Sequence, residues 1–315
     1  MRALICCSLL GLLACSAGQS ASSGAEHPRP GPPSHQELVQ RLVVAGKPMP
    51  GLSGMDRDES GHIIAVAERH SRLVRIRLQR DRAELISSIA LSGFAEGQDA
   101  EALAWLGSGR FAVGTERHGP SRESDEIFIY QLEGSTATLV ETLRLPYALW
   151  GMRAEDNRGI EGACYAGERL LIGVETTGIV QGKRFAPLAT YDFTRRRWIT
   201  ARLLLTSSEG LLSSLACRLD VAGQAIEVLA IERYYQTSRL LTFQVPLAGM
   251  RKTIVPVLVR DLAAITPQAI PNWEGVAWDS DEGVLLLNDN QTAELSGPIE
   301  VMRLNVDRAG RSDQR

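Results

Sequence analysis

The sequence predicts an all-β protein folded as a β-propeller of five four-stranded blades. Three observations support this prediction: the spread of glycine along the chain, a recurring two-strand motif, and the regular spacing of that motif. The 29 glycines among 315 residues indicate many turns, and therefore many short strands. A six-bladed propeller is the alternative, in which one blade would lack the motif.

The recurring motif consists of two short apolar runs, a glycine-containing turn between them, and an acidic residue at the end. This pattern is typical of a β-hairpin. A third strand-like run follows each acid, and a fourth often follows the third, as in residues 84–89 and 138–145. Four short strands in each repeat describe a propeller blade. The five copies end at Glu68, Glu116, Glu175, Glu232 and Asp289.

The spacing of these closing acids predicts the number of blades. Successive acids are separated by 48, 59, 57 and 57 residues, and the two ends of the chain together supply a fifth step of similar length. We expect residues 37–45 to form the outer strand that joins the first blade to the last. The propeller domain is then predicted to span residues 37–308, followed by a polar tail over 309–315.

The first 36 residues are predicted to be a targeting signal and a tether. A positively charged start and an apolar run too short to span a membrane indicate a secretory signal peptide over residues 1–14. The run ends in Leu-Leu-Ala-Cys, which resembles a bacterial lipobox, so Cys15 is the predicted lipidation site. An ordinary signal, cleaved after a small residue, is the alternative. Residues 15–36 are rich in Ser, Gly and Pro and predict a flexible tether. Ser16, after the cysteine, favours a lipoprotein of the outer membrane that faces the periplasm.

Composition excludes several classes of protein. Hydrophobic residues make up 44% and charged residues 23% of the chain, which is typical of a globular protein and not of a disordered one. The 34 basic and 37 acidic residues are nearly balanced and form no basic block, so nucleic-acid binding is not expected. Beyond the signal and the lipidated cysteine, only Cys164 and Cys217 remain. They could pair in an oxidising periplasm or stay as two small buried thiols.

Hairpin geometry gathers the acids at one end of the central channel. The first strand of each blade lines the channel and the second returns beside it, so a residue that begins the first strand lies close to one that ends the second. Five blades place ten such positions around one channel mouth, and eight of them are carboxylates. The predicted pairs are Ser53 with Glu68, Glu101 with Glu116, Glu161 with Glu175, Ser214 with Glu232, and Glu274 with Asp289.

Eight carboxylates in one place must be neutralised, and three interpretations are open. The acids could form structural ion pairs with Arg69, Arg117 and Arg233, each in a neighbouring blade because adjacent strand residues point to opposite sides. They could bind a divalent cation such as Ca²⁺, or act in catalysis with raised pKa values. The candidate metal ligands are Glu68, Glu101, Glu116, Glu161, Glu175, Glu232, Glu274 and Asp289.

The candidate catalytic residues are Glu161, Glu274, His70 and His118. Each histidine stands two residues after a closing acid, in a loop that leaves a second strand. The histidines could act as general bases or ligands, or they could be solvated loop residues. The chain contains no nucleophile elbow and no Walker motif, so serine-nucleophile and nucleotide-hydrolysing enzymes are not expected.

The ordered series of motifs resembles the bacterial family named "esterase-like activity of phytase", a phytase-like β-propeller group. The series includes Asp99-Ala-Glu101, Asn157-Arg-Gly-Ile-Glu161-Gly162 and Asn272-Trp-Glu274-Gly275, and the resemblance covers roughly residues 50–305. It implies hydrolysis of phosphate or carboxylic esters, with Ca²⁺ held among acidic residues as in propeller phytases. The chain departs from the family at Ala102 and Ser214-Leu215, and it has no evident basic cluster for a polyphosphate.

Three functions are therefore consistent with the sequence. The first is a metal-assisted ester hydrolase that acts on a small-molecule substrate at the propeller face. The second is a non-catalytic lipoprotein that binds a ligand or an envelope partner and whose acidic ring is structural. A lactonase-like sugar-acid enzyme is a third interpretation, because other Ca²⁺ propellers use a carboxylate at the channel mouth in this way.

Overall fold

The computed structural model describes residues 40–46, 51–119, 121–265, 272–280, 283–290 and 298–305. The chain divides into two compact units, 1–36 and 37–315, and every described residue belongs to the second. The predicted signal, the tether with Cys15 and the tail over 309–315 lie outside the described residues. No helix in these ranges is both long enough and apolar enough to cross a membrane.

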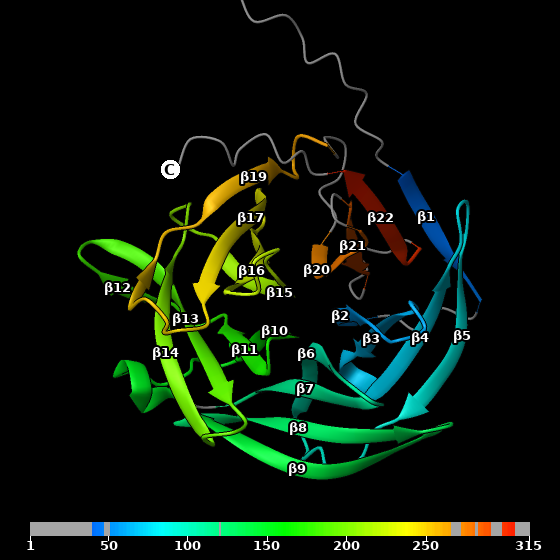
Figure 1. Ribbon diagram of the computed structural model, residues 1–315, viewed down its shortest axis with the longest axis horizontal. Helices are drawn as coiled ribbons and strands as arrows, with labels where there is room; N and C mark the ends of the chain where they lie inside the picture. The colour runs from blue at the N-terminus through cyan, green and yellow to red at the C-terminus, as the bar shows by residue number, and fades with distance from the viewer. Residues whose placement is uncertain are drawn as a thin grey trace, which may run out of the picture. The chain divides into compact units, whose positions relative to one another are not determined.

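The described strands form five antiparallel blades of four strands around a common centre, which confirms the predicted fold class (Figure 1). Blade 1 contains β2 (Leu52–Arg57), β3 (Ile63–Ala67), β4 (Arg72–Leu78) and β5 (Ala83–Ala90). Blade 2 contains β6 (Gln98–Gly107), β7 (Arg110–Arg117), β8 (Ser124–Glu133) and β9 (Thr136–Pro146). Blade 3 contains β10 (Ile160–Ala166), β11 (Arg169–Val174), β13 (Lys183–Asp192) and β14 (Arg197–Leu204).

The remaining two blades follow the same plan, with the first strand of each blade innermost (Figure 1). Blade 4 contains β15 (Leu211–Leu219), β16 (Ala225–Tyr234), β17 (Thr237–Pro246) and β19 (Val257–Asp261). Blade 5 contains β20 (Asn272–Trp278), β21 (Gly283–Asp289), β22 (Glu300–Asn305) and β1 (Gln40–Ala45). Short elements between the blade strands are η1 (Glu68–His70), η2 (Tyr147–Trp150), β12 (Gly178–Val180) and β18 (Thr253–Ile254).

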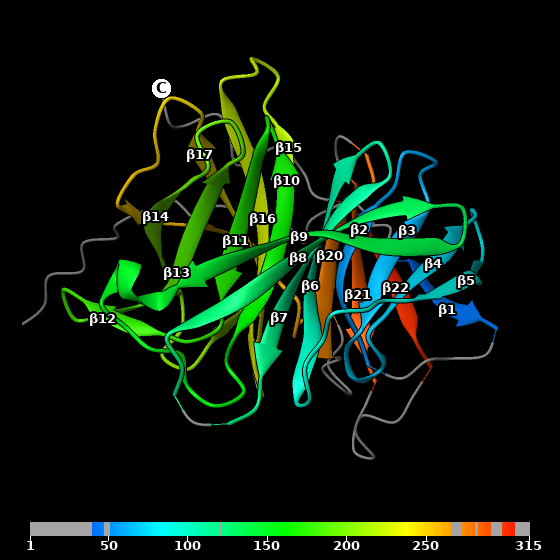
Figure 2. The same cartoon turned by 90° about the horizontal axis from the view of Figure 1, so that it is seen from below.

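The first described strand closes the ring. β1 is the outer strand of blade 5 and runs antiparallel to β22, with Val43 opposite Glu300. Its end then pairs in parallel with β5 of blade 1, where Val44 lies opposite Ala83. Residues 40–45 thus join the last blade to the first, as the segment over 37–45 was expected to do. Figure 2 shows the five blades from the side.

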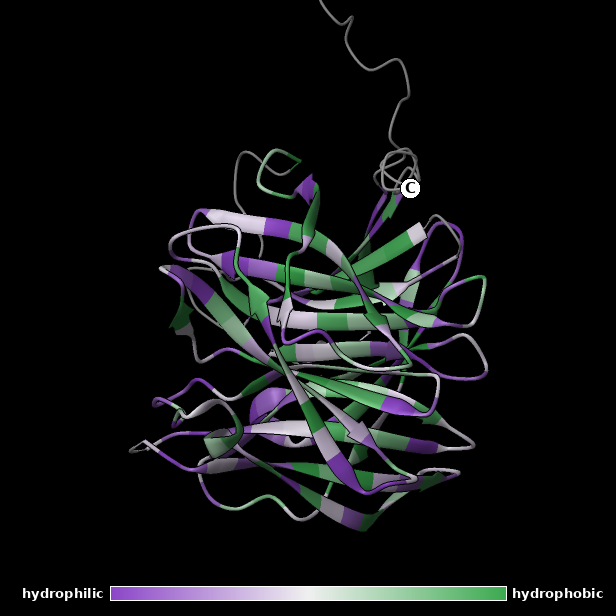
Figure 3. Cartoon of the chain, turned by 60° about the vertical axis from the view of Figure 1, so that its left-hand side comes forward, coloured by the Kyte–Doolittle hydropathy of each residue, from purple (hydrophilic) through white to green (hydrophobic). Residues whose placement is uncertain are grey.

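The core consists of five apolar clusters, and each cluster fills the interface between two adjacent blades. Inner strands are therefore buried on both faces. In β3, Ile64 and Val66 pack with Leu103 and Phe111 of blade 2, whereas the alternate residues pack with Leu285 of blade 5. Each such buried side chain contributes about 1.5–3 kcal/mol. Figure 3 shows apolar residues concentrated along the strands and polar residues in the turns.

A disulfide joins Cys164 of β10 to Cys217 of β15, the innermost strands of blades 3 and 4. The two Cα atoms lie 5.3 Å apart, a normal separation for a disulfide. Of the two alternatives that the sequence left open, the structure has the disulfide and not the pair of buried thiols. Residues 53 positions apart come together here because the innermost strands of consecutive blades are neighbours.

Reduction of this disulfide is expected to lower the melting temperature of the protein. The bond closes a long loop, and removing such a cross-link costs about 2–4 kcal/mol, which corresponds to roughly 2–4 °C for each kcal/mol in a domain of this size. A thermal melt with and without dithiothreitol measures the effect. Cys217→Ser should melt as the reduced wild type does and should not respond to dithiothreitol. Equal melting temperatures for the oxidised and reduced wild type would contradict the prediction.

Candidate functional site

The innermost strand of every blade carries a β-bulge at an equivalent place. At this point the strand has one residue more than the strand beside it. A bulge bends the strand and re-aims a side chain, and bulges are common beside functional sites. The bulged residues are Gly54, Glu101, Glu161, Ser213 and Glu274.

In each blade, a residue within one place of the end of the second strand lies opposite the residue two places before the bulge. These positions hold Ala67, Glu116, Glu175, Arg233 and Asp289. A strand residue and its neighbour point to opposite faces, so an error of one position exchanges a side chain that faces the channel mouth for one that does not. The repeats as aligned from the sequence are wrong by one position at Ser53, Ser214 and Glu232, whereas Glu68, which follows the end of β3, still reaches the mouth.

Two of the five bulges hold no carboxylate and instead connect blades. A Cβ atom at Gly54 would lie 2.6 Å from a backbone nitrogen of β6, so the close approach of blades 1 and 2 requires glycine there. Beside it, the Ser53 hydroxyl donates to the carbonyl of Glu101 at 2.7 Å. In blade 4, the Ser213 hydroxyl donates to the carbonyl of Trp273 at 3.1 Å. These serines therefore position the neighbouring glutamates.

Carboxylates from three consecutive blades converge in two triplets at the channel mouth. The first triplet is Glu68, Asp99 and Glu101, and the second is Glu116, Glu161 and Glu175. In each triplet, one oxygen from every carboxylate lies within 4.8 Å of one oxygen from the other two. The first triplet bridges blades 1 and 2, and the second bridges blades 2 and 3. Glu68 reaches its triplet from η1, directly after the end of β3.

Asp99 is a member of the first triplet that the sequence-based prediction missed. It lies opposite Glu116 in the register of blade 2. Asn272 holds the same place in blade 5, opposite Asp289. The available signal is an Asp or Asn two residues before the bulged glutamate in these two copies of the motif.

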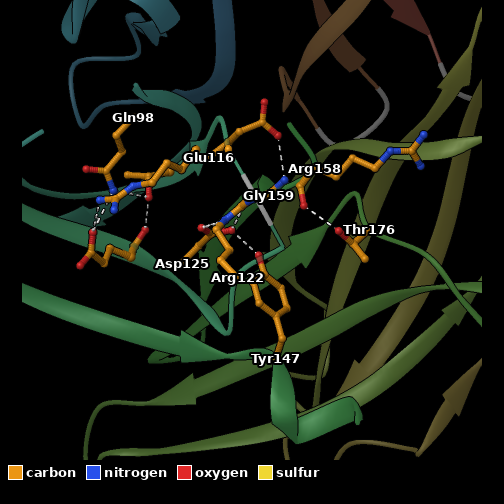
Figure 4. A network of polar contacts seen from close by, with 12 residues as sticks. Gln98, Glu116, Arg122, Asp125, Tyr147, Arg158, Gly159 and Thr176 are labelled. Atoms are coloured by element: carbon orange, nitrogen blue, oxygen red, sulfur yellow. Dashed lines mark hydrogen bonds and ion pairs between the residues drawn. The ribbon is translucent and has the colours of Figure 1, made fainter. Parts of the chain in front are cut away.

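The two triplets differ in how their carboxylates are held. Glu116 accepts a hydrogen bond from the Gly159 N–H at 2.7 Å (Figure 4). A Cβ atom at Gly159 would lie 2.8 Å from the Glu116 Cα, so this contact also requires glycine. Glu101, by contrast, is only 4% exposed, and its carboxylate forms no hydrogen bond or ion pair among the described residues. Burial and the neighbouring carboxylates therefore disfavour the charged form of Glu101.

A buried polar network supports the second triplet (Figure 4). Arg122 donates to Asp125 through Nη2 at 2.7 Å, and the Tyr147 hydroxyl donates to the same carboxylate. The Thr176 hydroxyl donates to the carbonyl of Arg158 at 2.7 Å. The Tyr147 contact joins blade 2 to the segment before β10, and the Thr176 contact joins the loops on either side of the inner hairpin of blade 3. Together they help to fix the positions of the acids that the two blades supply.

Burial and mutual repulsion shift the acids toward their neutral forms. Burial, followed by the neighbouring carboxylates, raises the pKa of Glu68 to about 8. Burial raises the pKa values of Glu175 and Glu274 to about 7, although Arg233 opposes the rise. The pKa values of Glu101 and Glu161 lie well above the ordinary range for the same reasons. The mouth therefore has too little positive charge of its own, and protons or a bound cation must balance it.

Glu232 does not belong to the channel mouth, contrary to the prediction. Its buried carboxylate accepts the N–H and hydroxyl of Thr206 at 2.9 and 2.5 Å. It also accepts the N–H and hydroxyl of Ser207 at 2.9 and 2.7 Å. Alternation along β16 turns Arg233 toward the mouth and Glu232 away from it. With four donors already bound, this carboxylate holds a loop and is not a metal ligand.

Only one of the three arginines predicted to pair between blades does so. Arg233 forms an ion pair with Glu274 of blade 5. Arg69 stays beside its own acid at 4.0 Å because η1 interrupts the strand alternation on which the prediction depended. Arg117 pairs with Glu126 of its own blade at 3.6 Å.

The other predicted catalytic residues lie at or beside the mouth. Glu161 belongs to the second triplet, and Glu274 accepts a hydrogen bond from Asn272 at 2.8 Å. The His118 Nε2 lies 3.4 Å from a carboxylate oxygen of Asp99, and its side chain is 58% exposed. His70 is exposed and belongs to η1 rather than to the expected loop.

A five-bladed propeller with a carboxylate-lined channel mouth is the class of protein that this fold and site define. A family model described as "Phytase-like: Esterase-like activity of phytase" matches residues 47–292. The chain therefore belongs to this family, and the resemblance inferred from its motifs is confirmed.

Several solved propeller structures are similar to the chain. The PQQ-bound aldose sugar dehydrogenase from Streptomyces coelicolor is 12% identical, with 86% of this chain and 99% of that one covered and a TM-score of 0.47. The soluble aldose sugar dehydrogenase from Escherichia coli is 10% identical, with 85% and 100% covered and a TM-score of 0.47. A streptogramin B lyase is 10% identical, with 85% and 98% covered and a TM-score of 0.38. These values support no inference about activity, and no curated protein matched the chain.

Proposed function

We propose that the protein is a metal-assisted hydrolase of phosphate or carboxylic esters, with its centre at the acidic channel mouth. The observation that carries the proposal is the convergence of two carboxylate triplets from three consecutive blades, in each of which one oxygen per carboxylate lies within 4.8 Å of the other two. Membership of a family described by esterase-like activity supports the same reaction class.

The residues fit Ca²⁺ better than a softer metal. Ca²⁺ takes about six to eight oxygen ligands at about 2.3–2.6 Å, so two oxygens on opposite sides of one ion lie about 4.8 Å apart. The triplets offer only carboxylate oxygens and no histidine or cysteine, a donor set that suits Ca²⁺ or Mg²⁺. The unpartnered carboxylate of Glu101 favours the same conclusion.

Each part of the mouth has a separate role in this proposal. Glu68, Asp99 and Glu101 would hold one cation, and Glu116, Glu161 and Glu175 a second. When bound, such a cation polarises an ester oxygen and makes a water molecule more acidic. His118 would accept the proton of the attacking water, because its imidazole stands at the exposed rim and Asp99 orients it. Glu274 is held by Arg233 and Asn272 and acts as a positioning residue.

A non-catalytic binding propeller is the second candidate function. The Arg233–Glu274 ion pair favours it, because this part of the ring is neutralised within the protein and connects blades 4 and 5. In that case the exposed face would hold a ligand or an envelope partner, and the acids would keep the blades in place.

We also propose that the protein is exported and anchored by a lipid on Cys15, in the outer membrane facing the periplasm. The disulfide between blades 3 and 4 supports this proposal, because disulfides persist in oxidising compartments such as the periplasm. Mass spectrometry of the protein from bacterial membranes tests it. An unmodified N-terminus upstream of Cys15 would contradict the lipid anchor.

A panel of phosphate monoesters, carboxylic esters and lactones tests the proposed reaction, with turnover measured for the full-length protein in EDTA and after addition of Ca²⁺. Turnover should require Ca²⁺ and should fall by about two orders of magnitude or more in Glu161→Gln, since the variant loses a ligand. Glu123→Gln is the matched control, because that side chain is 80% exposed and pairs with Arg153 outside the mouth. Ca²⁺ binding without turnover on any ester would overturn the hydrolase and leave the binding function.

A further inference from the structure

Arg233 interrupts the pattern of acids at the channel mouth. The position opposite the residue two places before the bulge holds an acid in blades 2, 3 and 5. In blade 4 the same position holds Arg233, which lies opposite Leu211. Strand register therefore directs a guanidinium group into the ring at a place where the other blades direct carboxylates.

The surroundings of Arg233 are those of a bound cation. Its Nη2 forms an ion pair with Glu274. Asn272 donates to Glu274 at 2.8 Å and to Asp289 at 3.0 Å, so both carboxylates are gathered at this point. Burial alone would lower the pKa of Arg233, but Glu274, Glu175 and other nearby carboxylates raise it above its ordinary value. The guanidinium is therefore permanently charged.

The other two acidic junctions contain no comparable group. At the junction of blades 1 and 2, Arg69 is 68% exposed and lies 4.0 Å from Glu68. At the junction of blades 2 and 3, Arg117 turns to Glu126 at 3.6 Å. Three carboxylates converge at each of these junctions. The charges of Arg233 and Arg122 act on the second triplet from a distance, but among the described residues neither arginine forms a direct ion pair with Glu116, Glu161 or Glu175. The carboxylate of Glu101 in particular forms no hydrogen bond or ion pair among the described residues.

We propose that Arg233 is a built-in counter-ion. At the junction of blades 4 and 5, its guanidinium occupies the place that a divalent cation takes at each of the other two acidic junctions. The inference rests on the proposed cation binding by the two triplets. It follows that the mouth binds two divalent cations and not three. It also follows that blades 4 and 5 stay joined through Glu274 when metal is absent.

Calcium titration of Arg233→Gln by isothermal calorimetry tests this proposal in the full-length protein. Loss of the guanidinium removes the ion pair of Glu274, and glutamine offers a carbonyl oxygen of the kind that Ca²⁺ accepts. The expected stoichiometry rises from two Ca²⁺ in the wild type to three in the variant. The variant should also melt below the wild type in EDTA and recover in Ca²⁺. Arg117→Gln is the matched control, because it also replaces an arginine by glutamine but that arginine pairs with Glu126. The Arg117→Gln variant should bind two Ca²⁺ ions.

Several outcomes would overturn the proposal. An unchanged stoichiometry in Arg233→Gln, or a loss of melting temperature that Ca²⁺ does not restore, would show that the guanidinium does not stand in for a cation. If Arg233→Gln folds only when Ca²⁺ is present during refolding, the proposal holds. If Arg233→Gln fails to fold both with and without Ca²⁺ while Arg233→Lys folds in both, the proposal is overturned. If the wild type binds no Ca²⁺, the proposed function fails, yet a gain of one ion in Arg233→Gln still supports the counter-ion.

Discussion

Calcium is expected to raise the melting temperature of the metal-free protein by about 10–20 °C. A ligand at 100 times its dissociation constant stabilises the folded state by about 2.7 kcal/mol for each site, and each kcal/mol shifts the melting temperature by roughly 2–4 °C in a domain of this size. The two triplets supply two such sites. The reason for the large effect is that the ions relieve repulsion among buried carboxylates that have too few partners of their own.

A substitution in either triplet should remove part of the calcium-dependent rise in melting temperature. Glu101→Gln removes an acid from the first triplet and Glu161→Gln one from the second, so each should lose about half of the calcium-dependent rise. The double variant should lose nearly all of it. Glu123→Gln, on an exposed side chain outside the mouth, should keep the full rise. Thermal melts in EDTA and in Ca²⁺ measure all four, and an undiminished rise in the double variant would contradict the assignment.

Stability of the metal-free protein is expected to fall as pH rises from about 4.5 to about 8. The pKa of Glu68 rises from 4.5 to about 8 on folding, and those of Glu175 and Glu274 rise from 4.5 to about 7. In this interval the folded state binds more protons than the unfolded state, so raising the pH favours unfolding. Below about pH 4.5 both states are protonated at these groups and the effect ends. Each pKa unit corresponds to about 1.4 kcal/mol for each group, so the melting temperature should fall by more than about 10 °C across this interval.

Melts in EDTA across this pH range measure the effect. Calcium should remove most of the slope, because a bound cation replaces the protons as counter-charge. Glu68→Gln should flatten the slope near pH 8, since Glu68 has the highest of the three pKa values. A metal-free protein that becomes more stable between pH 5 and pH 8 would contradict the raised pKa values at the mouth.

Most of the fold could be predicted from the sequence because propeller blades repeat. Apolar runs, glycine turns and closing acids recur at similar intervals, and the count of five blades follows from the spacing. The closing strand could also be predicted, since a ring needs one strand from the far end of the chain. The disulfide could not, because the pairing of Cys164 with Cys217 depends on which inner strands are neighbours.

The site could be predicted only in part, because it depends on register. Glu101, Glu116 and Glu161 follow the repeat and lie where they were expected. The bulges add one residue to each inner strand, so the position of a carboxylate relative to the turn does not reveal the face on which it lies. That is why Glu232 was assigned to the mouth and Arg233 to a supporting role. In the structure Arg233 lies among the acids and Glu232 binds a loop.

The number of calcium ions bound to the wild-type protein tests the central claim most directly. Equilibrium dialysis of the full-length protein against radioactive Ca²⁺, after removal of metal with EDTA, provides that number. We expect two ions for each chain, one for each carboxylate triplet, and one ion in Glu161→Gln. Retention no higher than that of a buffer blank would contradict the claim, and the acids would then be balanced by protons and by Arg233 alone.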